Sequence, residues 1–125
     1  MLPSGARLRR AGEFRATYEG GRAYPDALAV LHVQALSDRP DTCQVGFSVG
    51  KKVGNAVVRN RVKRRLRAII ATLLPEIVPG HRLILRARSR AAEADFETLE
   101  KAVKRLLDRA SLRPRSVVDT PEATP

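Results

Sequence analysis

The sequence is poor in cysteine and in long apolar stretches. Cys43 is the only cysteine among 125 residues, which excludes an internal disulfide framework and a zinc site with four thiolate ligands. No stretch approaches the roughly 20 apolar residues of a membrane span, and the N-terminus lacks the apolar core of a secretory signal. We therefore expect a protein of the reducing cytoplasm that does not enter a membrane.

Acidic residues are absent from Gln44 to Pro75, although this stretch includes the most basic part of the chain, from Lys51 to Arg67. The whole chain has 24 Lys and Arg against 13 Asp and Glu, a formal charge of +11. A carboxylate four residues away usually partners a cation on a surface helix, and none is available here. The repulsion among these cations therefore calls for an external anion, which charge alone does not identify as RNA, DNA or a membrane.

The basic segment has the apolar periodicity of a helix. One side of that helix collects Val58, Val62, Leu66, Ile69, Ile70 and Leu73. The other side collects Asn60, Arg61, Arg64 and Arg67. The first side is predicted to pack on a core, which leaves the second free to meet phosphate.

The chemistry of the basic segment favours nucleic acid over a merely solvated helix face, which remains the alternative. Arginine dominates, and its guanidinium group binds phosphate oxygens bidentately, while Asn60 can hydrogen-bond a base edge or a sugar. Gly54 relaxes the backbone before Asn55, a predicted helix N-cap. The amides at the start of the helix then lie near Lys51 and Lys52, an arrangement that suits a phosphate group.

Residues for nuclease chemistry by the protein itself are scarce. The two histidines, His32 and His81, fall in different predicted elements. No paired carboxylates or metal-spaced acidic cluster accompany the basic helix, and Asp38 and Asp41 are typical turn residues. We predict no catalytic residue and no metal held by protein ligands.

The length predicts a single domain with tails. A flexible basic arm is expected over residues 1–11, the domain over 12–112, and a disordered tail rich in Thr, Pro and Glu over 113–125. The predicted elements are a helix over Gly12–Tyr18, strands over Ala27–Gln34 and Cys43–Gly50, the basic helix, a strand over Arg82–Arg88, and a helix over about Ala92–Ala110. This order indicates an α+β fold, and the short polar connection between the first two strands predicts an antiparallel hairpin.

The last predicted helix differs from the basic helix in its charges. It carries an apolar stripe of Phe96, Leu99, Val103, Leu106 and Leu107. Its cations have acidic partners at the helical spacing, Glu97 with Lys101 and Glu100 with Lys104. We therefore assign this helix to packing.

The basic segment resembles the signature of the bacterial ribonuclease P protein family. The resemblance centres on Arg59-Asn60-Arg61, flanked by Lys51 to Val58 and by Val62-Lys63-Arg64. It extends over roughly Leu8 to Leu112, through Glu13-Phe14, Tyr18, Gly21, Gly46-Phe47-Ser48-Val49-Gly50 and Leu83-Ile84-Leu85. The order and the spacing of these motifs both agree with the family.

The resemblance implies a ribosomal-protein-like topology, α-β-β-β-α-β-α, with a four-stranded sheet and a left-handed β-α-β crossover through the basic helix. From the residues alone the third strand is the weakest. We expect it near Lys51–Val53 or from splitting the segment before it.

The resemblance also implies two RNA-facing surfaces. The first faces the catalytic RNA and comprises Lys51, Lys52, Asn55, Arg59, Asn60, Arg61, Lys63, Arg64 and Arg67. The second is a cleft between the first helix and the sheet, where Phe14 and Tyr18 match aromatic positions that hold the single-stranded 5′ leader of precursor tRNA. From the residues alone, the alternative is that these two rings belong to the core and that His32 is structural. His32 stands where relatives often have a third aromatic, which gives less stacking surface and adds a titratable group.

The function implied is that of the noncatalytic subunit of ribonuclease P, which assists endonucleolytic removal of the tRNA 5′ leader. The expected partners are the catalytic RNA, in a 1:1 complex with a monomeric protein, and precursor tRNA. The resemblance also implies that magnesium is required by the RNA partner. The alternatives are a ribosomal or general RNA-binding protein and, more weakly, a duplex DNA-binding protein, although a helix-turn-helix spacing is missing.

Overall fold

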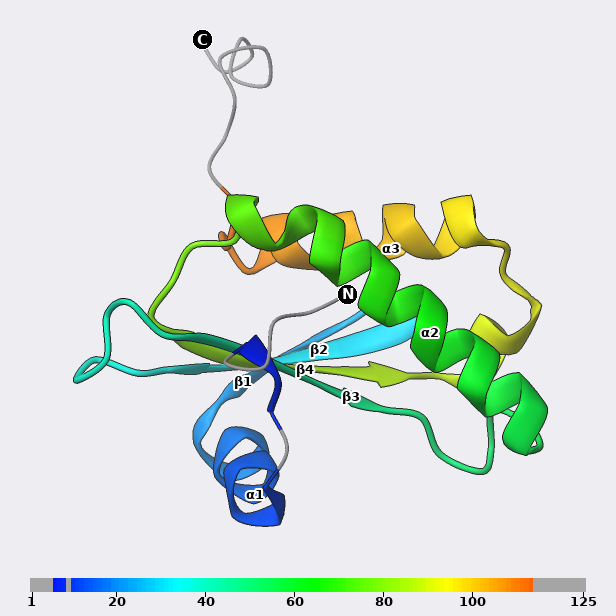
Figure 1. Ribbon diagram of the computed structural model, residues 1–125, viewed down its shortest axis with the longest axis horizontal. Helices are drawn as coiled ribbons and strands as arrows, with labels where there is room; N and C mark the ends of the chain where they lie inside the picture. The colour runs from blue at the N-terminus through cyan, green and yellow to red at the C-terminus, as the bar shows by residue number, and fades with distance from the viewer. Residues whose placement is uncertain (1–5, 9, 114–125) are drawn as a thin grey trace, which may run out of the picture.

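The structure, a computed structural model, describes residues 6–8 and 10–113. Its elements in chain order are α1 (Ala11–Gly20), β1 (Arg22–Pro25), β2 (Ala29–Ala35), β3 (Cys43–Ser48), α2 (Ala56–Leu73), η2 (Leu74–Glu76), β4 (His81–Ala87), η3 (Ser89–Glu93) and α3 (Phe96–Arg109). Figure 1 shows α2 and α3 on one face of the sheet and α1 on the other. The predicted α+β class is confirmed.

The four strands form one sheet in the order β1-β2-β4-β3. β1 and β2 are antiparallel, β2 and β4 are antiparallel, and β3 and β4 are parallel. The predicted antiparallel hairpin between the second and third of these strands is therefore wrong, because β4 lies between them. The chain from β3 crosses through α2 before it returns as β4, and Leu83, Ile84 and Leu85 are fully buried in this central position.

The strand that was weakest in the sequence is β1, which precedes the first predicted strand, so both places expected for it, near Lys51–Val53 and within the segment before it, are wrong. Residues 51–53 form a turn instead, in which the Val53 amide donates to the Gly50 carbonyl at 3.1 Å. β1 has four residues and ends at Pro25, which cannot donate to a ladder and is suited to an edge strand. β1 pairs with β2, and the short connection after Pro25 joins the two strands. β1 and β2 are therefore the antiparallel hairpin of the fold.

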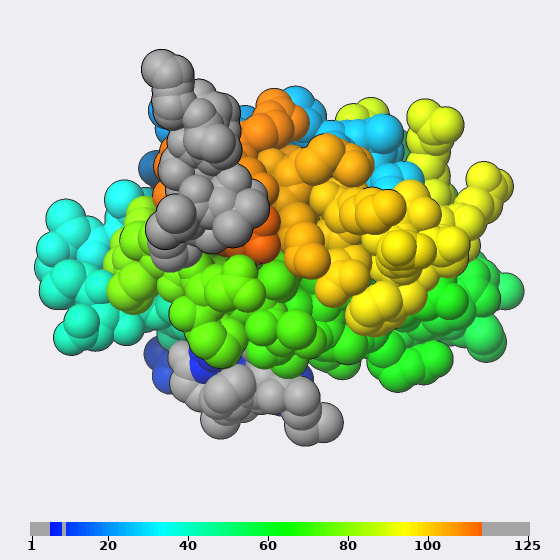
Figure 2. Space-filling view, turned by 90° about the horizontal axis from the view of Figure 1, so that it is seen from above, coloured from blue at the N-terminus to red at the C-terminus, as the bar shows by residue number. Residues whose placement is uncertain are grey.

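The main core lies between the sheet and the pair α2 and α3, which lie side by side above it in Figure 2. The predicted apolar side of α2 packs there: Val58 is half-buried, and the fully or almost fully buried residues are Val62, Leu66, Ile69, Ile70 and Leu73. The matching side of α3 buries Leu99, Ala102, Val103, Leu106 and Leu107. In the described part of the chain, no helix has both the length and the apolar character needed to cross a bilayer.

α3 begins later than predicted, and Phe96 lies outside its buried stripe. Residues 89–93 form η3, and the Asp95 side chain then accepts a hydrogen bond from the Thr98 amide at 2.8 Å, which caps the helix. Phe96 is the first residue after this cap, and 42 % of it is exposed. Its spacing agrees with the stripe, but its position in the first turn places it at the end of the core.

The packed part of the chain begins before residue 12, inside the segment expected to be a flexible arm. Ala6 and Leu8 are buried, and the Leu8 amide donates to the Val45 carbonyl at 3.0 Å. Arg7 forms an isolated parallel bridge with Val45, which covers part of the outer edge of β3. Residues 1–5 of that expected arm and residues 114–125 of the expected tail lie outside the described residues.

Candidate nucleic-acid interface

The connection into α2 determines where the first cations of the basic segment lie. Gly54 has φ +157°, and a Cβ built there would lie 2.9 Å from the Val58 side chain, so glycine suits this position. The Asn55 side chain accepts a hydrogen bond from the Val58 amide at 3.0 Å, as a helix cap. Lys51 and Lys52 lie exposed in the turn just before this cap. The predicted N-cap is confirmed.

The polar side of α2 carries cations with no ion pair in the described part of the chain. Asn60 and Arg64 are exposed, while the other predicted residues of this side are half-buried: Arg59, Arg61, Lys63 and Arg67. The five ion pairs found among residues 6–8 and 10–113 all involve other elements. The charge on α2 is therefore available to an external anion.

Two arginines of α2 are anchored to main-chain carbonyl groups of the segment before α3. Arg61 donates to the Ala92 carbonyl at 3.1 Å, and Arg65 donates to the Ala94 carbonyl at 2.8 Å. A carbonyl oxygen orients a guanidinium group but carries no net charge to cancel it. Arg61 was predicted as an RNA-facing residue and Arg65 was not, although the two are four residues apart and lie on one side of the helix.

A hollow of about 80 Å³ lies between α2, β3 and the N-terminal segment. Lys63 and Arg67, both predicted site residues, line it together with Arg7. The basic composition of residues 1–11 was recognised in the sequence, but the pairing of Arg7 with β3 was not. Three cations from two distant parts of the sequence are thus brought to one place.

On the other face of the sheet, α1 crosses a row of neighbouring residues formed by His32, Ile84 and Gly46 on β2, β4 and β3. The Phe14 ring lies on Gly46, where an added Cβ would be 2.5 Å from its Cζ atom. This glycine therefore allows α1 to approach the sheet closely. Phe14 is half-buried, so its ring takes part in packing while keeping an exposed portion.

Tyr18 and His32 form an edge-to-face pair beside Phe14. Their ring centroids are 4.7 Å apart, and Tyr18 is 39 % exposed. Burial, and then the charge of Arg86, lower the pKa of His32. Arg86 Nε donates to His32 Nε2 at 3.4 Å, which requires a neutral ring with its proton on Nδ1. The structure thus brings together all three residues predicted for the leader cleft.

A buried arginine of β4 contacts α1 from the sheet. Arg82 is only 7 % exposed, and its guanidinium group donates to Gln44 Oε1 at 3.3 Å and to Gln34 Oε1 at 3.2 Å. It also lies 3.9 Å from a carboxylate oxygen of Glu13 on α1. A buried charge that loses its partners is costly, so this network favours one placement of α1 on the sheet. The sequence placed Arg82 at the start of a predicted strand and gave no sign of its burial.

The protein is a small α+β domain whose four-stranded sheet carries a cationic helix without an ion pair in the described residues, a charge pattern that suits a polyanionic partner. The profile of the Ribonuclease P family matches residues 2–111. The ribonuclease P protein component of Mycobacterium sp. (strain KMS) is 45 % identical over 117 residues, 92 % of this chain and 96 % of that protein. That of Acidothermus cellulolyticus is 44 % identical over 110 residues, covering 87 % and 91 %.

Solved structures agree with this assignment. The Staphylococcus aureus RNase P protein superposes with a TM-score of 0.80 at 24 % identity, covering 87 % of this chain and 98 % of that one, which shows the shared fold. The Thermotoga maritima RNase P protein has a TM-score of 0.72 at 25 % identity, with 82 % and 96 % covered. The chain belongs to the ribonuclease P protein family and is a protein component of ribonuclease P.

Proposed function

We propose that this chain is the noncatalytic subunit of ribonuclease P and assists endonucleolytic removal of the 5′ leader from precursor tRNA. The observation that carries the proposal is the polar side of α2, whose cations have no ion pair in the described residues and coincide with the family motif. These side chains offset the repulsion between the phosphates of the catalytic RNA and those of the substrate. We propose one protein per RNA, acting in the cytoplasm.

The aromatic site on α1 is proposed to hold the single-stranded leader. Phe14 and Tyr18 offer ring surface to unpaired bases, and His32 supports Tyr18 from the sheet. Mature tRNA has no leader, so this contact would stabilise the complex with precursor tRNA selectively. Its effect should therefore appear as a difference in affinity between the two tRNAs.

Catalysis is proposed to belong to the RNA, which would also hold the magnesium ions. His32 and His81 lie on different strands, and His81 Nδ1 lies 3.3 Å from the Val78 carbonyl. Within residues 6–8 and 10–113, no three His, Cys, Asp or Glu side chains gather as a metal site. The role that these observations support is positional and electrostatic.

The decisive experiment is 5′ cleavage of a precursor tRNA at low magnesium by the cognate catalytic RNA, with the protein, without it, and by the protein alone. Cleavage only when both are present is the expected result. A lysine-rich ribosomal protein at equal concentration serves as the control for general charge effects. Cleavage by the protein alone, or equal rescue by the control protein, would refute the proposed role.

The leader contact is tested separately by measuring the affinity of the assembled complex for precursor and mature tRNA. Tyr18→Ala is the variant of choice, since Tyr18 is the most exposed of the three aromatic-site residues. We expect it to reduce the preference for precursor tRNA by about tenfold, the value of one stacked base. An unchanged preference in a folded Tyr18→Ala protein would exclude the leader site.

A further inference from the structure

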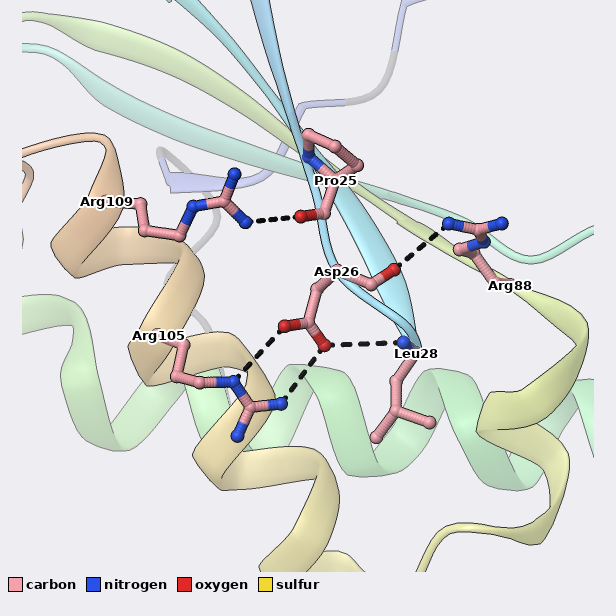
Figure 3. Close-up of polar contacts among 6 residues, drawn as sticks. All are labelled: Pro25, Asp26, Leu28, Arg88, Arg105 and Arg109. Carbon is pink, nitrogen blue, oxygen red and sulfur yellow. Dashed lines mark hydrogen bonds and ion pairs between the residues drawn. The ribbon is translucent and has the colours of Figure 1, made fainter.

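Three arginines converge on the turn between β1 and β2 (Figure 3). Arg105 of α3 donates from Nε and Nη2 to the two carboxylate oxygens of Asp26, at 3.2 and 3.1 Å. Arg88, just after β4, donates to the Asp26 main-chain carbonyl at 3.2 Å, and Arg109 donates to the Pro25 carbonyl. We call this set, Pro25, Asp26, Arg88, Arg105 and Arg109, the turn cluster.

The turn cluster has more positive than negative charge. The cluster contains three guanidinium groups and one carboxylate, that of Asp26, which leaves an excess of two positive charges. Burial alone would raise the pKa of Asp26. The hydrogen bonds from Arg105 and Leu28, with the charges of Arg105 and Arg109, outweigh burial and lower that pKa. Asp26 is therefore ionised at neutral pH, and both of its carboxylate oxygens accept hydrogen bonds from Arg105. Within the described residues, the side chains of Arg88 and Arg109 have carbonyl partners alone.

Arg88 and Arg109 are held in the same way as Arg61 and Arg65 on α2. In each case a main-chain carbonyl fixes one nitrogen of an arginine without cancelling its charge. The remaining donors of the exposed Arg88 and Arg109 point to solvent in a restricted geometry. Ordering these side chains in advance lowers the entropy cost of binding an anion.

A shallow hollow of about 340 Å³ adjoins the turn cluster. Arg105 and Arg90 line it, with Thr98 and one acidic residue, Glu93. Arg90 is exposed and has no hydrogen bond or ion pair in the described part of the chain. This hollow extends the cationic surface from α3 to the end of β4.

We propose that the turn cluster and Arg90 form a second RNA-binding surface, which contacts phosphate groups and does not distinguish bases. Forked donors without carboxylate partners match the bidentate geometry of backbone phosphates. Figure 2 shows α3 between α2 and the blue segment of β1 and β2, so the turn between β1 and β2 and the helix α2 lie on opposite sides of α3. The two surfaces contact different stretches of RNA. The identity of that RNA rests on the proposed function.

The test is binding of the cognate catalytic RNA by the full chain over a range of salt concentrations. The double variant Arg88→Gln/Arg109→Gln removes the two carbonyl-anchored charges of the turn cluster. Arg22→Gln/Arg39→Gln is the matched control, since both residues are exposed, remote in the sequence from α2 and α3, and without a side-chain partner in the described residues. For the first variant we expect about tenfold weaker binding and a slope of log K against log salt that is shallower by about 1.4 to 1.8.

The control variant should change both quantities less. Equal behaviour of the two double variants, both with the catalytic RNA alone and with tRNA added to the assembled complex, would overturn the second surface. If the loss appears only when tRNA is added to the assembled complex, and equally for precursor and mature tRNA, the phosphates belong to tRNA. If it appears with the catalytic RNA alone, they belong to that RNA. Wild-type protein that fails to bind the catalytic RNA would refute the proposed function rather than this surface.

Because Arg88 and Arg109 also hold the turn, two further variants separate binding from folding. Arg90→Gln breaks no contact in the turn and should make the salt slope shallower by about 0.7 to 0.9. Arg88→Lys/Arg109→Lys keeps the charge and should keep the slope, even if the turn is less stable. An unchanged slope in Arg90→Gln, together with a shallower slope in the lysine variant, would contradict the proposal.

Discussion

α2 and α3 lie side by side on the same face of the sheet, and each buries one apolar stripe, yet they use their charges differently. In α3, Lys101 pairs with Glu97 and Arg105 with Asp26, and only Arg109 at its C-terminal end is known to be held by a carbonyl group, that of Pro25, among the described residues. α2 has no acidic residue at all, and its Arg61 and Arg65 are held by carbonyl groups. We infer that the chemical nature of a cation's partner, more than the number of cations, distinguishes a surface that supports the fold from one that binds an anion. A carboxylate cancels the charge, whereas a carbonyl only directs it.

The first test asks whether the two apolar stripes contribute equally to the core. Leu66 on α2 and Leu106 on α3 are both fully buried. Leu66→Ala and Leu106→Ala should each lower the free energy of unfolding by about 2 to 5 kcal/mol, through lost burial and a residual cavity. Urea denaturation measures both. A cost below about 1 kcal/mol for either would show that its helix is not an equal part of the core.

The second test reverses one charge on each helix. Arg64 is exposed and has no partner in the described residues, whereas the exposed Lys101 is paired with Glu97 at 3.9 Å. Arg64→Glu should weaken binding to the catalytic RNA by about tenfold and make the salt slope shallower by at least about 1. Lys101→Glu changes the net charge equally but should cost less than about threefold. Equal losses would mean that net charge alone governs binding.

The third test compares the caps of the two helices. Asn55→Ala removes the cap of α2 and should cost about 1 kcal/mol at any pH, because an amide does not titrate. Asp95→Ala should destabilise the protein where the carboxylate is ionised and should have progressively less effect at acidic pH. Hydrogen bonds from Thr98 lower the pKa of Asp95, so its contribution is complete above the ordinary value of 3.8 and is lost as the pH falls through the lowered pKa. A series of thermal melts from pH 7 to well below pH 3.8, the ordinary pKa of an aspartate, distinguishes these profiles.

The smallest effect is expected when α2 receives the kind of partner that α3 has. Asn60→Glu places a carboxylate four residues before Arg64 on the exposed side of α2. Such a pair should raise the free energy of unfolding by about 0.3 to 0.5 kcal/mol. RNA affinity should fall at the same time, since the new carboxylate competes with phosphate. Parallel gains in stability and in RNA affinity would contradict the comparison.

Much of the helical layer was predictable because its signals are local. The periodicity of Val62, Leu66 and Ile69 identifies the buried side of α2, and Asn55 identifies its first turn. The missing carboxylates were visible in the sequence as well. The family motif placed Phe14, Tyr18 and His32 in one site, and the structure brings these three residues together. Their proposed contact with the leader stays a prediction.

The sheet was less predictable because its order depends on contacts between distant residues. Nothing local to Ala29–Ala35 or Cys43–Ser48 indicates that β4 will come between them. β1 was not predicted because its four residues, Arg-Ala-Tyr-Pro, are too few to show the periodicity of a strand. The burial of Arg82 was equally hidden, since its partners Gln34, Gln44 and Glu13 come from three other elements.

The central place of β4 has a consequence for how the chain folds during synthesis. β2 and β3 leave the ribosome early, but each must wait for β4 as its shared neighbour, and β4 follows the entire basic helix. Completion of the sheet is therefore a late event that joins residues distant in the sequence. Such contacts raise the contact order, which is associated with slow folding. A nascent chain that stops before His81 presents unpaired strand edges and a cationic helix without the strand that completes its core. The helix that is proposed to bind RNA is thus synthesised before the domain that positions it can form.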